Sequence, residues 1–237
     1  MSMQPETAGP GATLIKRLFK QTALTMLVLG AILFLTAGTI DWPGAWVLMA
    51  QTGILGLLSA YIIARHDPAL LRERMRGPIQ REQKPWDKIL LAVIMALCVA
   101  MPIAAGLDVR FGTSDIPAWL QVTGALAIAV GLYMFHVVME TNSYATAVVR
   151  IQSERGHQVI STGPYAFMRH PMYSGAIFYF LGMGLLLGSW WAVAIAFVIV
   201  ALFALRAVWE ENTLIAELPG YADYAERVRY RLIPRVW

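Results

Sequence analysis

The fold is decided by the stretch YSGAIFYFLGMGLLLGSWWAVAIAFVIVALFALRAV, residues 173–208. Two apolar runs, 173–187 and 190–208, flank the turn residues Gly188 and Ser189. The first run has about 15 residues and would rise only ~22 Å as a helix, less than the roughly 30 Å of bilayer hydrocarbon. The stretch therefore predicts a tight helical hairpin in a membrane, with a short first arm.

Four further apolar segments precede this hairpin, at about 18–40, 45–64, 89–107 and 119–139. Each has roughly the 20 apolar residues that a helix needs to cross a bilayer. We therefore predict an all-α fold, a polytopic bundle of about six spans. The first segment follows Lys16, Arg17 and Lys20, as in a signal peptide, but its apolar run is longer than the usual 7–15 residues, which favours an uncleaved helix.

The composition agrees with a membrane protein. Hydrophobic residues make up 58% of the 237 residues and charged residues 14%, while an average soluble domain has roughly 45–50% and 25%. This excludes an ordinary soluble enzyme and an intrinsically disordered chain. The lone cysteine, Cys98, excludes an internal disulfide framework and a cysteine-rich metal site, and we expect no metal.

The positions of lysine and arginine predict the orientation. With six spans, 18 of the 19 basic residues fall on the side that holds both termini, and Arg110 falls on the other side. The positive-inside rule places the basic side in the cytoplasm. Seven of these residues lie in or beside the 65–88 loop, and we interpret them first as an orientation signal: Arg65, Arg72, Arg74, Arg76, Arg81, Lys84 and Lys88. For the cluster Arg72, Arg74, Arg76 and Arg81, contact with anionic headgroups is a secondary interpretation.

Two polar regions on the basic side contain the candidate functional residues. One, 140–172, contains the turn signal Gly163-Pro164-Tyr165 and ends at an apolar helix. The other begins at Arg206, where Arg206 and Glu210 are four residues apart and share a helix face. Taken singly, each feature is also typical of a membrane interface, which attracts aromatic and basic residues. Their combination is what indicates a site.

The motifs of these regions resemble the isoprenylcysteine carboxyl methyltransferase family. The matching residues are His157-Gln158-Val159-Ile160, then Gly163-Pro164-Tyr165 and Arg169-His170-Pro171-Met172-Tyr173, then Arg206, Glu210-Glu211, Leu214, Gly220-Tyr221 and Tyr224. The resemblance covers about the last 100 residues. It implies a catalytic region at 140–237 that follows a four-span membrane region at 1–139. It also implies S-adenosylmethionine as the methyl donor.

The resemblance also implies roles for individual residues. Cofactor-contacting positions correspond to His157, Gln158, Val159, Ile160, Tyr165, His170, Pro171, Met172, Tyr173 and Glu210. Arg206 corresponds to a substrate-binding position, and we expect Arg206 and Glu210 to be the catalytic pair. Arg150 stands where the eukaryotic enzymes have a cofactor-contacting glutamine.

Elementary chemistry is consistent with these roles. A carboxylate acceptor is already ionised at pH 7, so methyl transfer to it requires alignment and no general base. Arg206 is suited to orient a carboxylate through a bidentate pair, and Glu210 to accept hydrogen bonds from the amino group of the cofactor. The aromatic faces of Tyr165 and Tyr173 are suited to adenine or to the positive sulfonium.

The prediction is an integral membrane S-adenosylmethionine-dependent methyltransferase that acts on a lipophilic acceptor, in a bacterial inner membrane with the site facing the cytoplasm. A phospholipid or amine N-methyltransferase is the first alternative. It would need a neutral amine, and a base such as Glu211 would then matter more than Arg206. A non-catalytic membrane protein is the second alternative. The expected partners are the bilayer and the acceptor, with no nucleic acid, and the sequence gives neither the acceptor nor the oligomeric state.

Overall fold

The computed structural model describes residues 10–77, 79–80 and 82–237, so Arg81 of the predicted basic loop lies outside the described residues. The described chain is all-helical, as predicted, and contains no strand. Its α-helices are α1 (Pro10–Ala37), α2 (Pro43–His66), α3 (Pro68–Arg74), α4 (Pro85–Phe111), α5 (Ala118–Thr141), α6 (Pro171–Leu186), α7 (Trp190–Glu217) and α8 (Tyr221–Arg227). Two short 3₁₀ turns, η1 (Ser153–Arg155) and η2 (Gly163–Ala166), lie between α5 and α6.

Five helices are long and apolar enough to cross a membrane: α1, α2, α4, α5 and α7. The sixth predicted span, α6, is the shorter apolar helix that the sequence indicated. Large apolar side chains point outward along the bundle, among them Leu27 (69% exposed), Leu35 (75%) and Ile54 (66%). A bilayer is the environment in which such a surface is stable, because water would not tolerate an apolar area of this extent. The chain is an integral membrane protein.

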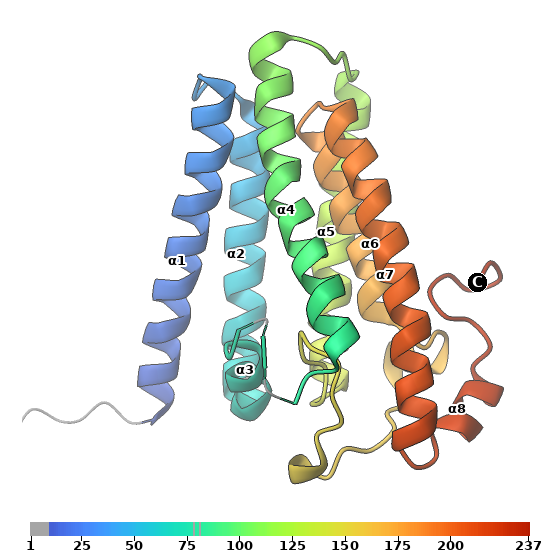
Figure 1. Ribbon diagram of the computed structural model, residues 1–237. Coiled ribbons are helices and arrows are strands. Elements are labelled where there is room, and N and C mark those ends of the chain that lie inside the picture. The colour runs from blue at the N-terminus through green and yellow to red at the C-terminus, as the bar shows by residue number, and fades with distance from the viewer. Residues whose placement is uncertain (1–9, 78, 81) are drawn as a thin grey trace, which may run out of the picture.

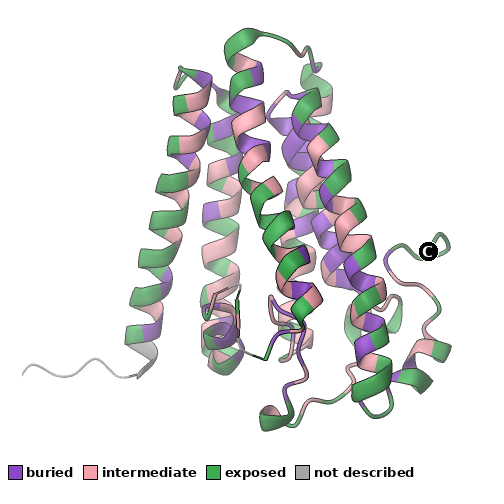
Figure 2. Ribbon diagram, in the orientation of Figure 1, coloured by how far each residue is buried: buried purple, intermediate pink, exposed green. Residues whose placement is uncertain are grey.

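The short helix α6 lies inside the bundle (Figure 1), where it packs against α5 on one side and α7 on the other. Buried residues gather along it and along the facing sides of its neighbours (Figure 2). The turn that follows α6 has Gly188 in the left-handed region (φ 75°) and Ser189 as the N-cap of α7. Because α6 is flanked by the longer helices α5 and α7, it does not need to span the hydrocarbon by itself.

Glycines allow α5 and α6 to approach closely. A Cβ atom added to Gly182 of α6 would lie 2.6 Å from the carbonyl oxygen of Gly124 on α5, and a Cβ added to Gly124 would lie 2.6 Å from the Gly182 oxygen. Small residues are typical of helix contacts in membranes, since they let backbones meet. This contact fixes the position of α6, whose N-terminal end carries several of the predicted site residues.

We therefore expect Gly182→Ala to lower the free energy of unfolding by about 1–3 kcal/mol, because the backbone contact must open. Thermal denaturation in detergent or nanodiscs measures the loss. The matched control is Gly56→Ala on α2, where an added Cβ meets nothing within 4 Å. The control should be neutral or stabilising by up to about 1 kcal/mol, since alanine favours a helix over glycine. Equal stability of the two variants would contradict the packing argument.

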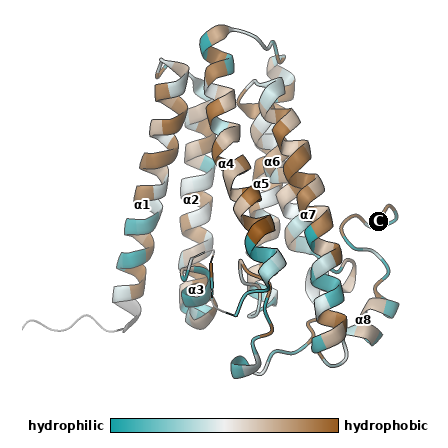
Figure 3. Ribbon diagram, in the orientation of Figure 1, coloured by the Kyte–Doolittle hydropathy of each residue, from teal (hydrophilic) through white to brown (hydrophobic). Residues whose placement is uncertain are grey.

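Polar segments gather at one end of the bundle. The helices α3 and α8 lie there (Figure 1), and hydrophilic residues concentrate at the same end (Figure 3), while the segment after α8 runs back along the bundle. The cores of this end are small clusters separate from the main bundle core. One cluster joins α3 to α1 and α2 through Leu14, Leu18, Ile63, Leu70 and Leu71. The other joins α8 to the loop between α5 and α6 through Leu218, Tyr221 and Tyr224. The predicted site residues lie at this end.

Candidate active site

A cavity of about 310 Å³ lies at the polar end of the bundle. It is lined by residues of α3 to α8 and of the loop between α5 and α6. The structure brings together here the predicted residues His157, Gln158, Val159, Ile160, Tyr165, His170, Met172, Tyr173, Arg206 and Glu210. Pro171 is buried in the first turn of α6 and does not line the cavity. Segments far apart in sequence therefore share one site, and its wall also includes Arg74 of α3, Leu91 of α4 and Phe135 of α5.

The cavity has an apolar part and a polar part. Its apolar lining includes Leu91, Phe135 and Ala176, together with Phe180 and Phe203 from the membrane-embedded parts of α6 and α7. The ring of Phe203 stacks on Phe180 at 6.0 Å and on Tyr173 at 5.2 Å between centroids. Charged residues line the part nearer the loops. Such a cavity fits an apolar ligand from the bilayer and a polar ligand from water.

Tyr173 connects the predicted residues of α6 with those of α7. Its hydroxyl donates to Oε2 of Glu210 at 2.5 Å, and its ring stacks on His170 with centroids 5.5 Å apart. The guanidinium of Arg206 lies 5.7 Å from the centroid of the same ring. Oε1 of Glu210 accepts no hydrogen bond from the described residues. Glu210 is thus a fixed carboxylate that retains one oxygen for a ligand.

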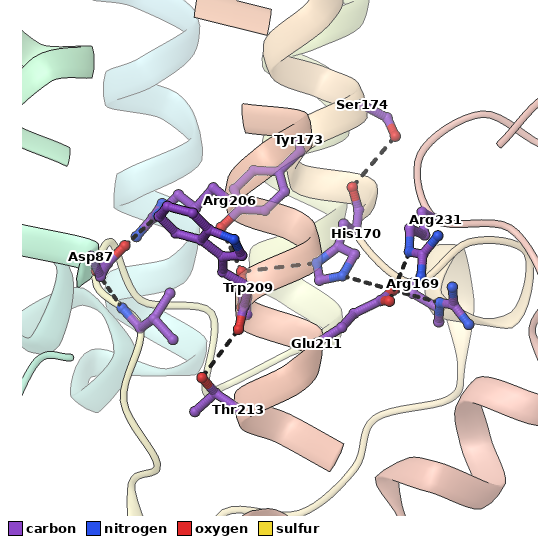
Figure 4. A network of polar contacts seen from close by, with 12 residues as sticks. Asp87, Arg169, His170, Tyr173, Ser174, Arg206, Trp209, Glu211, Thr213 and Arg231 are labelled. Atoms are coloured by element: carbon purple, nitrogen blue, oxygen red, sulfur yellow. Dashed lines mark hydrogen bonds and ion pairs between the residues drawn. The ribbon is translucent and has the colours of Figure 1, made fainter. Parts of the chain in front are cut away.

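Arg206 is held by an ion pair across the bundle (Figure 4). Its Nε donates to Oδ1 of Asp87 at 2.7 Å, and its Nη2 donates to the carbonyl of Ala147 at 2.9 Å. Asp87, in the first turn of α4, is fully buried and also accepts from Gln83 Nε2 (2.7 Å) and Val149 N (2.9 Å). The pair ties α7, α4 and the loop of residues 147–149 together. Asp87 is not among the predicted site residues, although its position at the start of an apolar helix is a signal for it.

Glu211 holds a second network, next to the cavity (Figure 4). It pairs with Arg169 Nε at 2.7 Å and Arg231 Nε at 2.8 Å, and it lies 3.2 Å from His170 Nε2. Backbone hydrogen bonds from Arg169 N and His170 N to the carbonyls of Tyr230 and Arg231, both 2.9 Å, reinforce this junction. Glu211 itself is buried and is not part of the cavity lining. Its contacts indicate a structural role at the junction of α6, α7 and the C-terminal segment.

Aromatic residues close the loop side of the cavity. Asn142 Nδ2 donates to the Tyr165 hydroxyl at 2.9 Å, and the Tyr224 hydroxyl donates to the Tyr165 carbonyl at 2.8 Å. Burial raises the pKa of Tyr165 to about 12, so its phenol is protonated at neutral pH. The ring of His157 packs against that of Tyr144 in a tilted arrangement, with the centroids 4.5 Å apart. Burial, with Arg155 nearby, lowers the pKa of His157 and favours a neutral imidazole.

Arg150 lies in the cavity wall. It pairs with Glu73 at 3.1 Å, Glu82 at 2.8 Å and Glu154 at 2.7 Å. Three carboxylates therefore surround one guanidinium, and they link α3, the segment before α4 and the α5–α6 loop. Its charge is satisfied within the protein, which indicates a scaffolding role at this position.

Comparison with known proteins gives matches over this region. Residues 119–219 match the family model described as phospholipid methyltransferase. The chain is 32% identical over 114 residues to protein-S-isoprenylcysteine O-methyltransferase B of Arabidopsis thaliana. It is 24% identical over 214 residues to protein-S-isoprenylcysteine O-methyltransferase of Saccharomyces cerevisiae. The C-terminal part of this chain is therefore similar to proteins of both descriptions.

The extent of these matches differs between relatives. The Arabidopsis alignment covers 46% of this chain and 57% of the relative, and a human relative is 31% identical over 46% of this chain and 40% of its own length. The yeast alignment covers 88% of both proteins. The chain thus spans about half the length of the plant and human relatives that it matches. The methyltransferase-like region contains the loop, α6 and α7 that form most of the cavity.

Proposed function

We propose that the chain is an integral membrane methyltransferase, which uses S-adenosylmethionine to methylate a carboxylate of a lipophilic acceptor, as its prenylcysteine-methylating relatives are named to do. The single observation that carries this proposal is the cavity, in which motif residues from the loop, α6 and α7 meet an apolar part within the bundle. A polar methyl donor and an acceptor dissolved in the membrane require a cavity that has both a polar part and an apolar part.

The residues of the polar part fit the proposed cofactor. S-adenosylmethionine supplies a methyl group activated by a positive sulfonium. Glu210 offers its unpartnered Oε1 to a cationic or amino group, and the ring of Tyr165 offers an aromatic face in the same wall. The other proposed cofactor contacts are His157, Gln158, Val159, Ile160, His170, Met172 and Tyr173, with Pro171 acting only by starting α6 behind them.

The acceptor would lie in the apolar part, with its reacting end at Arg206. Nε and Nη2 of Arg206 are used by Asp87 and Ala147, while Nη1 has no partner among the described residues. Arg206 is therefore a donor of fixed orientation that retains N–H groups for the acceptor. Since a carboxylate is already ionised, the contribution of the site is to hold the reacting groups in line and to exclude water.

We place the site on the cytoplasmic side of a bacterial inner membrane. The support is the charge distribution: of the described basic residues, Arg110 at the end of α4 is alone at the opposite end of the bundle. The polar end that carries the cavity is the basic one, and basic ends of membrane proteins face the cytoplasm. A cofactor made in the cytoplasm would then enter without crossing the bilayer.

Methylation of a phospholipid or another amine is the second candidate function, because the matching family model is described as phospholipid methyltransferase. An amine must lose a proton to react, so this chemistry needs a base. Glu211, the base that the sequence suggested for it, is outside the cavity and is paired with Arg169 and Arg231. Glu210 is the carboxylate that remains for this role, and the O-methylation function fits the site better.

The test is a transfer assay with the purified full chain in nanodiscs. Radiolabelled S-adenosylmethionine is supplied with extracted membrane lipids or with S-prenylcysteine analogues, and mass spectrometry identifies the product. We expect a methyl ester, which releases labelled methanol at high pH. A base-stable product would instead indicate N-methylation. Failure of the purified protein to bind the labelled cofactor would refute both functions and favour a non-catalytic membrane protein.

A further inference from the structure

Arg74 is a cavity residue that the basic-loop interpretation did not assign to the site. It is the last residue of α3, and its side chain lines the cavity. Its Nη1 donates to the carbonyl of Ala145 at 2.7 Å and lies 3.8 Å from Sδ of Met172. Nε and Nη2 have no partner among the described residues. These two groups form the edge that binds a carboxylate through two parallel hydrogen bonds.

Each of the other three arginines of the cavity wall already forms an ion pair with a carboxylate of the protein. Arg206 pairs with Asp87, Arg169 pairs with Glu211, and Arg150 pairs with three glutamates. Among the described residues no carboxylate forms an ion pair with Arg74, although the neighbouring Glu73 is used by Arg76 and Arg150. The wall therefore contains one cation whose counter-ion the described protein does not supply.

An unpaired cation in such a place is costly. Burial lowers the pKa of Arg74, and the nearby phenol of Tyr165, which is protonated at neutral pH, supplies no negative charge to offset it. Buried charges in proteins are normally paired, because removing an isolated charge from water is strongly unfavourable. A ligand that brought a negative charge would remove this cost. Such a ligand would gain affinity from a group that the protein has left open.

The helix that carries Arg74 is held in place by several contacts. Asp67 caps α3 by accepting from Leu70 N at 2.9 Å, and Leu70 and Leu71 are buried against α1 and α2. The adjacent Glu73 is fixed by Arg150. A side chain on such a support is suited to orient a ligand, since little ordering remains to be done on binding.

We propose that Arg74 binds the carboxylate of a ligand in the cavity. This rests on the proposed function, which offers two carboxylates: that of the acceptor and that of the methionine part of the cofactor. If the carboxylate is that of the acceptor, Arg74 binds its negative charge. Arg206, which is already paired with Asp87, then aligns the acceptor for the reaction. The neutral methyl ester formed by O-methylation of the acceptor would lose the interaction, so recognition by Arg74 would favour its release.

The experiment uses the full chain in nanodiscs. It measures how much more tightly the protein binds a ligand that has a carboxylate than a matched ligand that lacks it. Dissociation constants are compared for N-acetyl-S-farnesylcysteine and its carboxamide, and for S-adenosylhomocysteine and its decarboxylated form. The variant is Arg74→Gln, and the matched control is Arg72→Gln, an exposed arginine on the same helix. A melting curve of each protein confirms that it is folded. A structural role for Arg74 would weaken acid and amide alike and would leave their ratio unchanged.

In the wild type and in Arg72→Gln we expect one of the two acids to bind about tenfold to a hundredfold more tightly than its partner that lacks the carboxylate. Arg74→Gln should reduce that ratio to near one. The ligand pair that shows the change identifies which carboxylate Arg74 binds. An unchanged ratio for both pairs in Arg74→Gln, in a protein that still binds S-adenosylhomocysteine, would overturn the proposal and leave the proposed function standing. Absence of all binding by the wild type would overturn both.

Discussion

Arg206→Met is expected to lower the free energy of unfolding by about 3–5 kcal/mol, because it leaves Asp87 buried without its cation. Asp87 is fully buried, and the Nε–Oδ1 contact of 2.7 Å is its one ion pair with the described residues. The change also frees the loop at Ala147, which loses its hydrogen bond from Arg206. Methyl transfer should be lost as well. Chemical or thermal denaturation in nanodiscs measures the stability.

The double variant Asp87→Asn/Arg206→Met separates the charge from the packing. If the unpaired carboxylate causes the loss, the neutral asparagine should restore most of the stability while activity stays absent. Arg110→Met is the control, since this arginine is exposed at the opposite end of α4. Changes at such a surface position are usually within about 0.5 kcal/mol. A double variant no more stable than Arg206→Met alone would contradict the ion-pair argument.

The helical architecture could be predicted from the sequence because membrane spans are a local signal. Each needs only a run of apolar residues of sufficient length, and the runs at 45–64, 89–107 and 119–139 correspond to α2, α4 and α5 within a few residues. The run at 18–40 corresponds to α1, which begins earlier, at Pro10. The 173–187 run was predicted to be short, and α6 is the short helix of the bundle. Its enclosure between α5 and α7 depends on which helices meet, and no local pattern gives that.

The candidate site could be predicted only in part, for a related reason. Residues within one motif, such as Tyr165 and His170, are near one another in the sequence, and the cavity holds both. Arg74 and Asp87 lie in the N-terminal half and reach the site only through packing. The charge count placed Arg74 in a basic loop, but it could not show which arginines have carboxylate partners. That distinction needs contacts, such as those of Arg150 with three glutamates.

Glu210→Gln is expected to weaken binding of S-adenosylmethionine about tenfold to a hundredfold, while the fold stays intact. The proposed contact is between the open Oε1 and a positive group of the cofactor, and hydrogen bonds to charged groups contribute about 1.5–3 kcal/mol. Stability should change little, because the glutamine oxygen can still accept from the Tyr173 hydroxyl. Isothermal titration with the cofactor and a melting curve give the two quantities.

The adjacent Glu211→Gln is the matched comparison, since it makes the same chemical change one residue away. Glu211 lies outside the cavity and neutralises Arg169 and Arg231, so its loss leaves two cations without their carboxylate. We expect it to destabilise the junction of α6, α7 and the C-terminal segment, with a clear fall in melting temperature. Any protein that remains folded should bind the cofactor more nearly as the wild type does. If the two variants lost cofactor affinity equally at matched stability, the assignment of Glu210 to the ligand and of Glu211 to the scaffold would be wrong.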